Sequence, residues 1–162
     1  MTTDVTAERQ YAEEAAMVLA GMGLPLAYGK LMGWLLICMP AAQSGAELAA
    51  ALGLSKGSVS AGLRMLENTG LVRRVPMPGR RGAFYEMTPD AIMRAASSEK
   101  YAQFRQLMDR GLEVVGGEDA PGAERLRTNR DFYAFLEREI PKLIERFKEE
   151  ARSEAGKGQN DG

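Results

Sequence analysis

The chain has 162 residues, of which 45% are hydrophobic and 27% charged, a composition typical of one globular domain and not of a fibrous or disordered chain. It contains no histidine and one cysteine. This excludes histidine general bases, Ser-His and Cys-His nucleophile pairs, an internal disulfide and a multi-cysteine zinc site. The chain also lacks a phosphate-binding glycine loop, so we expect neither an enzyme nor a cofactor or bound metal.

The net charge of −1 hides a local asymmetry. Residues 44–88 hold six basic and three acidic side chains, a net charge of +3, whereas the rest of the chain holds 15 basic and 19 acidic ones. A positive segment between acidic flanks favours an anionic partner for that segment alone.

The first residues lack the basic region and apolar run of a secretory signal. The most apolar stretch, residues 31–42, has 12 residues, and a membrane-spanning helix needs about 20. We therefore expect a protein of the bacterial cytoplasm with no membrane partner.

Two helices are predicted at the start of the chain, over residues 5–22 and 25–39. The first carries an apolar stripe at spacings of four, three and four, formed by Tyr11, Ala15, Val18 and Met22. The second begins at a proline and is apolar nearly all round, which indicates a buried helix.

A helix-turn-helix follows. Ser44 and Glu47 form a capping-box pattern, which predicts a helix from residue 44 to about 52. Gly53 then makes a turn, and Ser55 is expected to cap a second helix that extends to about residue 68.

A β-hairpin is predicted next, with strands over residues 71–75 and 83–87 and a turn rich in proline, glycine and arginine between them. A helix-turn-helix followed by such a hairpin, or wing, is a winged helix. The predicted fold is therefore mainly α with a small β-hairpin, and its DNA-binding domain spans residues 25–88.

The rest of the chain is predicted to be helical. One long helix starts at Thr88-Pro89 and ends near residue 115, and a last helix carries an apolar stripe from Phe132 to Phe147. Pro141 lies inside this stripe and predicts a kink or short break. Residues 1–24 and 89–152 are expected to form a helical dimerisation region, and residues 153–162 a disordered tail.

The second helix of the helix-turn-helix is the candidate recognition helix. Val59, Leu63 and Leu66 share one apolar face, which leaves a small, polar face free to enter a major groove. Serine hydroxyls and Arg64 suit base edges or phosphates, and Lys56 suits the DNA backbone. The expected contact residues are Ser55, Lys56, Gly57, Ser58, Ser60, Ala61 and Arg64. An ordinary amphipathic surface helix is the alternative interpretation.

Four arginines in the hairpin favour the recognition helix over an ordinary surface helix. Arg80 and Arg81 lie between glycines at its tip, and Arg73 and Arg74 lie on its first strand. A run of charges is usually only a solvated surface, but arginines on a narrow hairpin after a helix-turn-helix suit phosphates or a minor groove. This order of elements favours DNA binding.

The run from Leu48 to Ser60, with Leu63, Leu66-Glu67 and Gly70-Leu71-Val72 after it, resembles MarR-type winged-helix regulators. The segment Gly29 to Leu36 is similar to their GbsR-like branch. The resemblance implies a homodimer joined by its outer helices, which represses or activates nearby genes, repression being the expected sign. It also implies that a small-molecule effector can change the spacing of the two wings.

Some GbsR-like members respond to choline-type ligands, and a quaternary amine is recognised by an aromatic cage. The aromatic residues expected to contribute to such an effector pocket are Tyr28, Trp34, Tyr101 and Phe104. The alternative is that these side chains are core residues, which is the usual place of aromatics at helical spacing.

A different class of function remains open at this point. A winged helix can also bind another protein as a scaffold or assembly module without contacting DNA, and the acidic isoelectric point of about 5.7 is compatible with that. Such a module would pair its hairpin arginines with an acidic surface on the partner.

Overall fold

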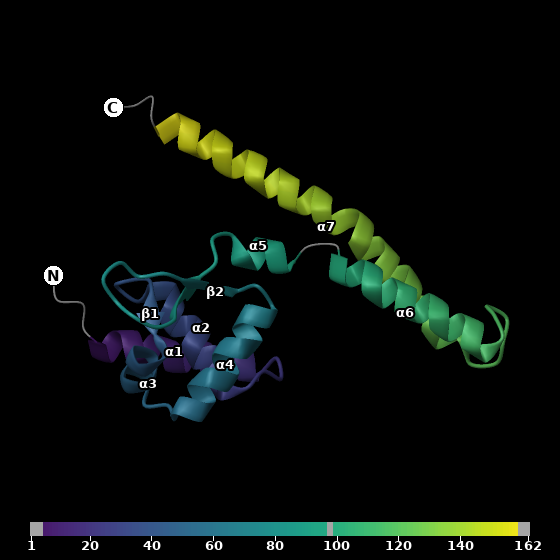
Figure 1. Cartoon of the computed structure of the whole chain (residues 1–162). Helices are drawn as coiled ribbons and strands as arrows, with labels where there is room; N and C mark the ends of the chain where they lie inside the picture. The colour runs from purple at the N-terminus through teal and green to yellow at the C-terminus, as the bar shows by residue number, and fades with distance from the viewer. Residues whose placement is uncertain (1–4, 97–98, 159–162) are drawn as a thin grey trace. The chain divides into compact units, whose positions relative to one another are not determined.

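The computed structural model describes residues 5–96 and 99–158, which belong to two compact units (Figure 1). The first unit ends at Ala95 and the second begins at Ala96. In the part of the chain that is described, no helix combines the length and the apolar character needed to span a membrane.

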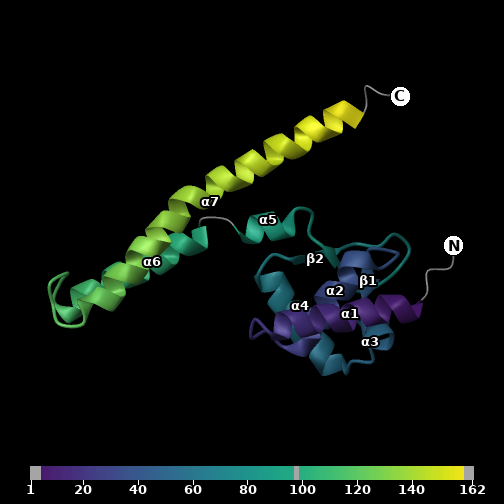
Figure 2. The ribbon, with the colours of Figure 1, turned by 180° about the vertical axis from the view of Figure 1, so that it is seen from behind.

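The first unit is a winged helix. Its helices are α1 (Val5–Ala20), α2 (Leu26–Ile37), α3 (Gly45–Leu52), α4 (Lys56–Asn68) and the short α5 (Ala91–Ala95). Its sheet has the antiparallel order β1-β3-β2, with β1 at Gln43–Ser44, β2 at Val72–Val75 and β3 at Phe84–Met87 (Figure 2). The predicted hairpin is confirmed. The third strand, β1, was not predicted, because two residues are too few to show the alternation that marks a strand.

The core of this unit lies around α2, as its apolar sequence predicted. The largest fully buried side chains are Leu31 of α2, Leu48 of α3, Leu66 of α4 and Phe84 of β3. Leu31, Leu48 and Leu66 belong to one core cluster that also includes Val72 of β2, so α2, the helix-turn-helix and the sheet share one core.

The contact of α1 with α2 is made by small residues and not by the predicted apolar stripe of α1. Ala12 and Ala16 are buried. A Cβ added to Gly29 would lie 2.5 Å from the Cα of Ala16, and one added to Gly33 would lie 2.6 Å from the Cβ of Ala15. The two backbones are thus too close for large side chains between them, and the predicted stripe residues Tyr11, Val18 and Met22 are 41%, 62% and 71% exposed.

The second unit consists of α6 (Glu99–Val115) and α7 (Ala123–Gly158), which pack side by side. The ring of Phe104 stacks on that of Tyr133 with centroids 5.0 Å apart. The single long helix predicted from Thr88 is wrong, because α5 and α6 are separate helices. Ala91 of α5 is buried in the core of the first unit, so the two helices are stabilised by different cores.

The last helix is longer and more regular than predicted. It continues without a break through the exposed Pro141, and it extends to Gly158, so the disorder expected from Ser153 is wrong up to that residue. Residues 159–162 lie outside the described part. Charged side chains one turn apart, such as Lys148 and Glu145 at 3.2 Å, stabilise this exposed helix in place of a core.

Candidate nucleic-acid interface

The helix-turn-helix is positioned by its two predicted caps. The Ser44 hydroxyl accepts the backbone N–H of Glu47 at 3.2 Å, and the Glu47 carboxylate accepts the backbone N–H of Ser44 at 2.7 Å. Gly53 closes α3 with a φ of +62°, in the left-handed region that favours glycine. The Ser55 hydroxyl then accepts the backbone N–H of Ser58 at 3.1 Å, which starts α4.

Helix α4 has the buried and free faces that its sequence predicted. Val59, Leu63 and Leu66 are buried. On the other side, the exposed candidate residues are Ser55, Lys56, Gly57, Ser60, Ala61 and Arg64. The half-buried Ser58 is different, because its hydroxyl accepts a hydrogen bond from that of Ser55 at 2.9 Å. These two serines therefore serve the helix cap, and Ser60 keeps a hydroxyl without such a role.

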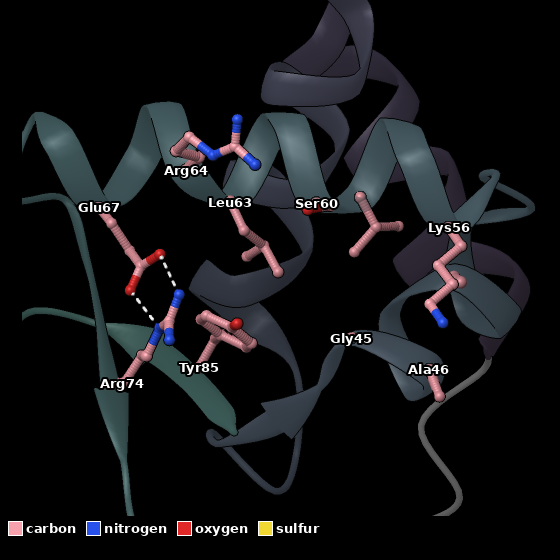
Figure 3. A pocket seen from close by; sticks show the side chains of 11 residues that line it. Gly45, Ala46, Lys56, Ser60, Leu63, Arg64, Glu67, Arg74 and Tyr85 are labelled. Atoms are coloured by element: carbon pink, nitrogen blue, oxygen red, sulfur yellow. Dashed lines mark hydrogen bonds and ion pairs between the residues drawn. The ribbon is translucent and has the colours of Figure 1, made fainter. Parts of the chain in front are cut away.

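A groove of about 510 Å³ lies between α3, α4 and the hairpin, and we call it the helix–hairpin groove (Figure 3). Lys56, Ser60 and Arg64 lie along it at spacings of four residues, which places them on one side of α4. The remaining lining residues are Gly45, Ala46, Ala49, Val59, Leu63, Glu67, Arg74 and Tyr85. The groove thus combines an apolar floor with cationic side chains.

Two hairpin arginines on β2 are held by carboxylates. Arg73 lies opposite Glu86 in the strand register and donates to one of its oxygens at 2.9 and 2.6 Å. Arg74 donates to both oxygens of Glu67 on α4, at 2.7 and 3.3 Å, and its guanidinium lies 5.5 Å from the ring centre of Tyr85. Hydrogen bonding to the Glu67 carboxylate, with further stabilisation by nearby charges, raises the pKa of Arg74.

A third arginine, Arg80 at the tip, connects the hairpin to α3. It donates to Glu47 at 2.8 Å, and its guanidinium lies 4.6 Å from the ring centre of Phe84. The hydrogen bond from the Ser44 backbone, followed by that from Arg80, holds the pKa of the Glu47 carboxyl below its usual value. One carboxylate therefore caps α3 and fixes the hairpin at once.

These pairs account for the charge of the whole segment. Its three carboxylates, Glu47, Glu67 and Glu86, each bind one hairpin arginine. Among the basic side chains of residues 44–88, those that form no ion pair are then Lys56 and Arg64 on α4 and Arg81 on the hairpin tip, which carry the net +3 of the segment. The sequence showed the four hairpin arginines, but not which of them are already neutralised.

Comparison with known proteins agrees with this geometry. Over 141 residues the chain is 32% identical to the HTH-type transcriptional regulator MmpR5 of Mycobacterium tuberculosis (strain ATCC 25618 / H37Rv), covering 85% of each chain. The family model of MmpR5-like MarR family transcriptional regulators matches residues 90–150. The chain belongs to the MarR family of transcriptional regulators.

Two further matches fit a MarR-family protein. The IclR helix-turn-helix domain model matches residues 35–76, which include α3 and α4. A solved structure described as the crystal structure of a transcriptional regulator is 31% identical, with a TM-score of 0.80, covering 88% of this chain and 99% of that one. The predicted resemblance to MarR-type regulators is confirmed. The named relative is MmpR5 and the matches above name no GbsR-like protein, so membership of the GbsR-like branch stays a prediction.

The aromatic residues proposed for an effector pocket fall into different units of this MarR-family chain. Tyr28 and Trp34 are buried in the first unit, where the indole N–H of Trp34 donates to the Gln43 side chain at 2.8 Å. Tyr101 and Phe104 belong to α6 of the second unit. Core packing, the alternative interpretation, accounts for Tyr28 and Trp34, and Gln43 is the partner that sequence reasoning missed.

Two kinds of group could support other chemistry, a metal-binding cluster and a cysteine thiol. In residues 5–96 and 99–158, no cluster of three or more His, Cys, Asp or Glu side chains could bind a metal ion. Burial raises the pKa of the Cys38 thiol to about 11, which leaves it a poor nucleophile at neutral pH.

Proposed function

We propose that this MarR-family protein is a sequence-specific regulator that binds double-stranded DNA as a homodimer, with α4 in a major groove and the β2–β3 hairpin beside it. The supporting observation is that the unpaired cations of residues 44–88 lie on the exposed face of α4, at Lys56 and Arg64, and on the hairpin tip that follows it, at Arg81. A helix needs such a face to approach base edges, and unpaired cations are what bind phosphates.

The proposed residues have different tasks. Arg64 and Ser60 lie in the middle of the exposed face of α4, so they are the proposed readers of base edges. Lys56, at the first turn of α4, contacts the DNA backbone, where the helix N-terminus also favours a phosphate. Arg81 contributes sequence-independent affinity from the hairpin tip, and the paired Arg73, Arg74 and Arg80 contribute less than their number suggests.

A homodimer is supported by apolar surface that each unit leaves exposed. In the first unit it includes Tyr11, Val18 and Met22 on α1, and in the second Phe132, Leu143 and Phe147 on α7. Exposed apolar residues in such numbers on outer helices are typical of a subunit interface. Two-fold symmetry would present two α4 helices to half-sites about 34–36 Å apart. Repression of nearby genes and control by a small-molecule effector complete the proposal.

Fluorescence anisotropy with labelled duplexes, including the region upstream of the gene, tests this function. The three unpaired cations of residues 44–88 in each of two subunits give six phosphate contacts, so a log–log plot of affinity against salt should have a slope of about −5. Failure to bind any duplex at about 50 mM salt would contradict DNA binding.

The second candidate is a winged helix that binds protein instead of DNA, and what favours it is the small unpaired charge of the hairpin. Three of its four arginines are already paired, which leaves little charge for phosphates. The same titration separates the two functions, because a protein-binding module would show neither sequence preference nor a steep salt dependence.

A further inference from the structure

Glu67 is an acidic residue on the surface proposed to face DNA. It lies three residues after Arg64 on α4 and lines the helix–hairpin groove together with Lys56 and Ser60 (Figure 3). A carboxylate beside a proposed recognition surface repels phosphates, so its presence there needs an explanation other than solubility.

The carboxylate of Glu67 holds Arg74 in a two-pronged ion pair. Both oxygens accept from the guanidinium, at 2.7 and 3.3 Å, and Arg74 also lies over the ring of Tyr85. The side chain of Glu67 is 25% exposed and that of Arg74 63%, so the pair faces the open groove and is not part of the core. An exposed pair of this kind contributes little to the stability of the fold, so it can be removed by substitution without unfolding the protein.

The strand register distinguishes this pair from the neighbouring one. Arg74 lies opposite Tyr85, and Arg73 lies opposite Glu86. Because successive side chains of a strand point to opposite faces, Arg74 and Arg73 lie on opposite faces of the sheet. Arg74 lines the helix–hairpin groove and Arg73 does not.

We propose that Glu67 is a specificity-determining residue, which withholds Arg74 from DNA phosphates and so limits sequence-independent binding. This inference rests on the proposed function. Affinity for arbitrary DNA depends on how many phosphates are neutralised, and a genome offers about a million or more competing sites. A regulator with one fewer free cation per subunit is less retained at those sites, while its base contacts through α4 are unchanged.

The substitution Glu67→Gln tests the proposal in the full-length protein. Glutamine keeps the side-chain length and helix propensity of glutamate but releases Arg74. Anisotropy titrations with a random-sequence duplex should show a salt slope steeper by up to about 0.9 per subunit. Affinity should rise about two- to fivefold per subunit, the range expected when one exposed ion pair no longer competes.

Two variants control for charge and for Arg74 itself. Glu13→Gln also adds one positive charge and releases a cation, Lys30, whose amino group lies 2.6 Å from the Glu13 carboxylate, but neither residue lines the groove. It should leave the slope unchanged. The double variant Glu67→Gln/Arg74→Gln has the net charge of the natural chain, and it should return the slope to the natural value.

The outcomes are distinct. A slope for Glu67→Gln no steeper than that for Glu13→Gln, or a double variant that keeps the gain, overturns the role of Glu67 while DNA binding stands. A natural protein that binds no duplex overturns the proposed function and this inference together. Glu67→Ala, which releases Arg74 without adding an amide, should also steepen the slope, and thermal melting of each variant establishes that it is folded.

Discussion

Replacing Arg81 by alanine should remove an unpaired cation from the hairpin tip without breaking any ion pair among the described residues. Each phosphate contact contributes about 0.9 to the salt slope, so a dimer that loses two contacts should have a slope shallower by about 1.8. If the other contacts are unchanged, this difference corresponds at 0.1 M salt to an affinity lower by about 60-fold. The loss should be similar for all sequences, because phosphates carry no sequence information.

The assay is an anisotropy titration of one duplex at salt concentrations from about 50 to about 300 mM. The matched control is Glu47→Gln/Arg80→Gln, in the same hairpin and with unchanged net charge. Glutamine at position 47 can still complete the capping box of α3, so the helix start is preserved. If this control flattens the slope as much as Arg81→Ala does, paired and unpaired arginines contribute alike, and our division of the hairpin arginines is wrong.

Three further changes test other parts of the structure. Arg64→Ala or Ser60→Ala should change the order of preference among operator variants, measured by competition binding, and an equal loss for every sequence would contradict their proposed role as readers. Gly29→Ala should lower the free energy of unfolding by about 1–3 kcal/mol in urea titrations, because the added Cβ would lie 2.5 Å from a backbone atom of α1. Gly57→Ala, whose Cβ would meet nothing closer than 3.9 Å, is its control and should not destabilise the protein. Burial raises the pKa of Cys38 from 9.0 to about 11, so alkylation at pH 9 should be slow until urea unfolds the protein, and stability should fall as the pH rises from 9 towards 11.

The local features of the fold could be predicted from the sequence because their causes are local. Ser44 with Glu47, Gly53 and Ser55 each determine a helix end through hydrogen bonds or backbone conformations that span a few residues. The buried face of α4 likewise follows from the spacing of its apolar residues. These signals located the candidate recognition helix without knowledge of the tertiary structure.

Other features depend on residues that only the folded chain brings together. Arg80 meets Glu47 across 33 positions of sequence, and no periodic pattern records such a pair. The helix contact between α1 and α2 was missed for a different reason. Hydrophobicity alone favoured the large side chains of α1, whereas the close approach at Gly29 selects small ones. The residues of the candidate site could therefore be predicted. Which of its arginines are paired with glutamates could not, because these pairs form only in the folded chain.

The length of α7 has a consequence for folding. Its 36 residues extend about 54 Å, whereas the 17 residues of α6 extend about 26 Å. Phe104 stacks on Tyr133 near the start of α6, so the part of α7 beyond Pro141 continues past α6, with Leu143 and Phe147 exposed (Figure 1). Most of the stability of a helix in a protein comes from packing of its apolar face and not from the helix itself. If a second subunit covers this segment, helical content and melting temperature become functions of protein concentration, and dilution alone would unwind the end of α7.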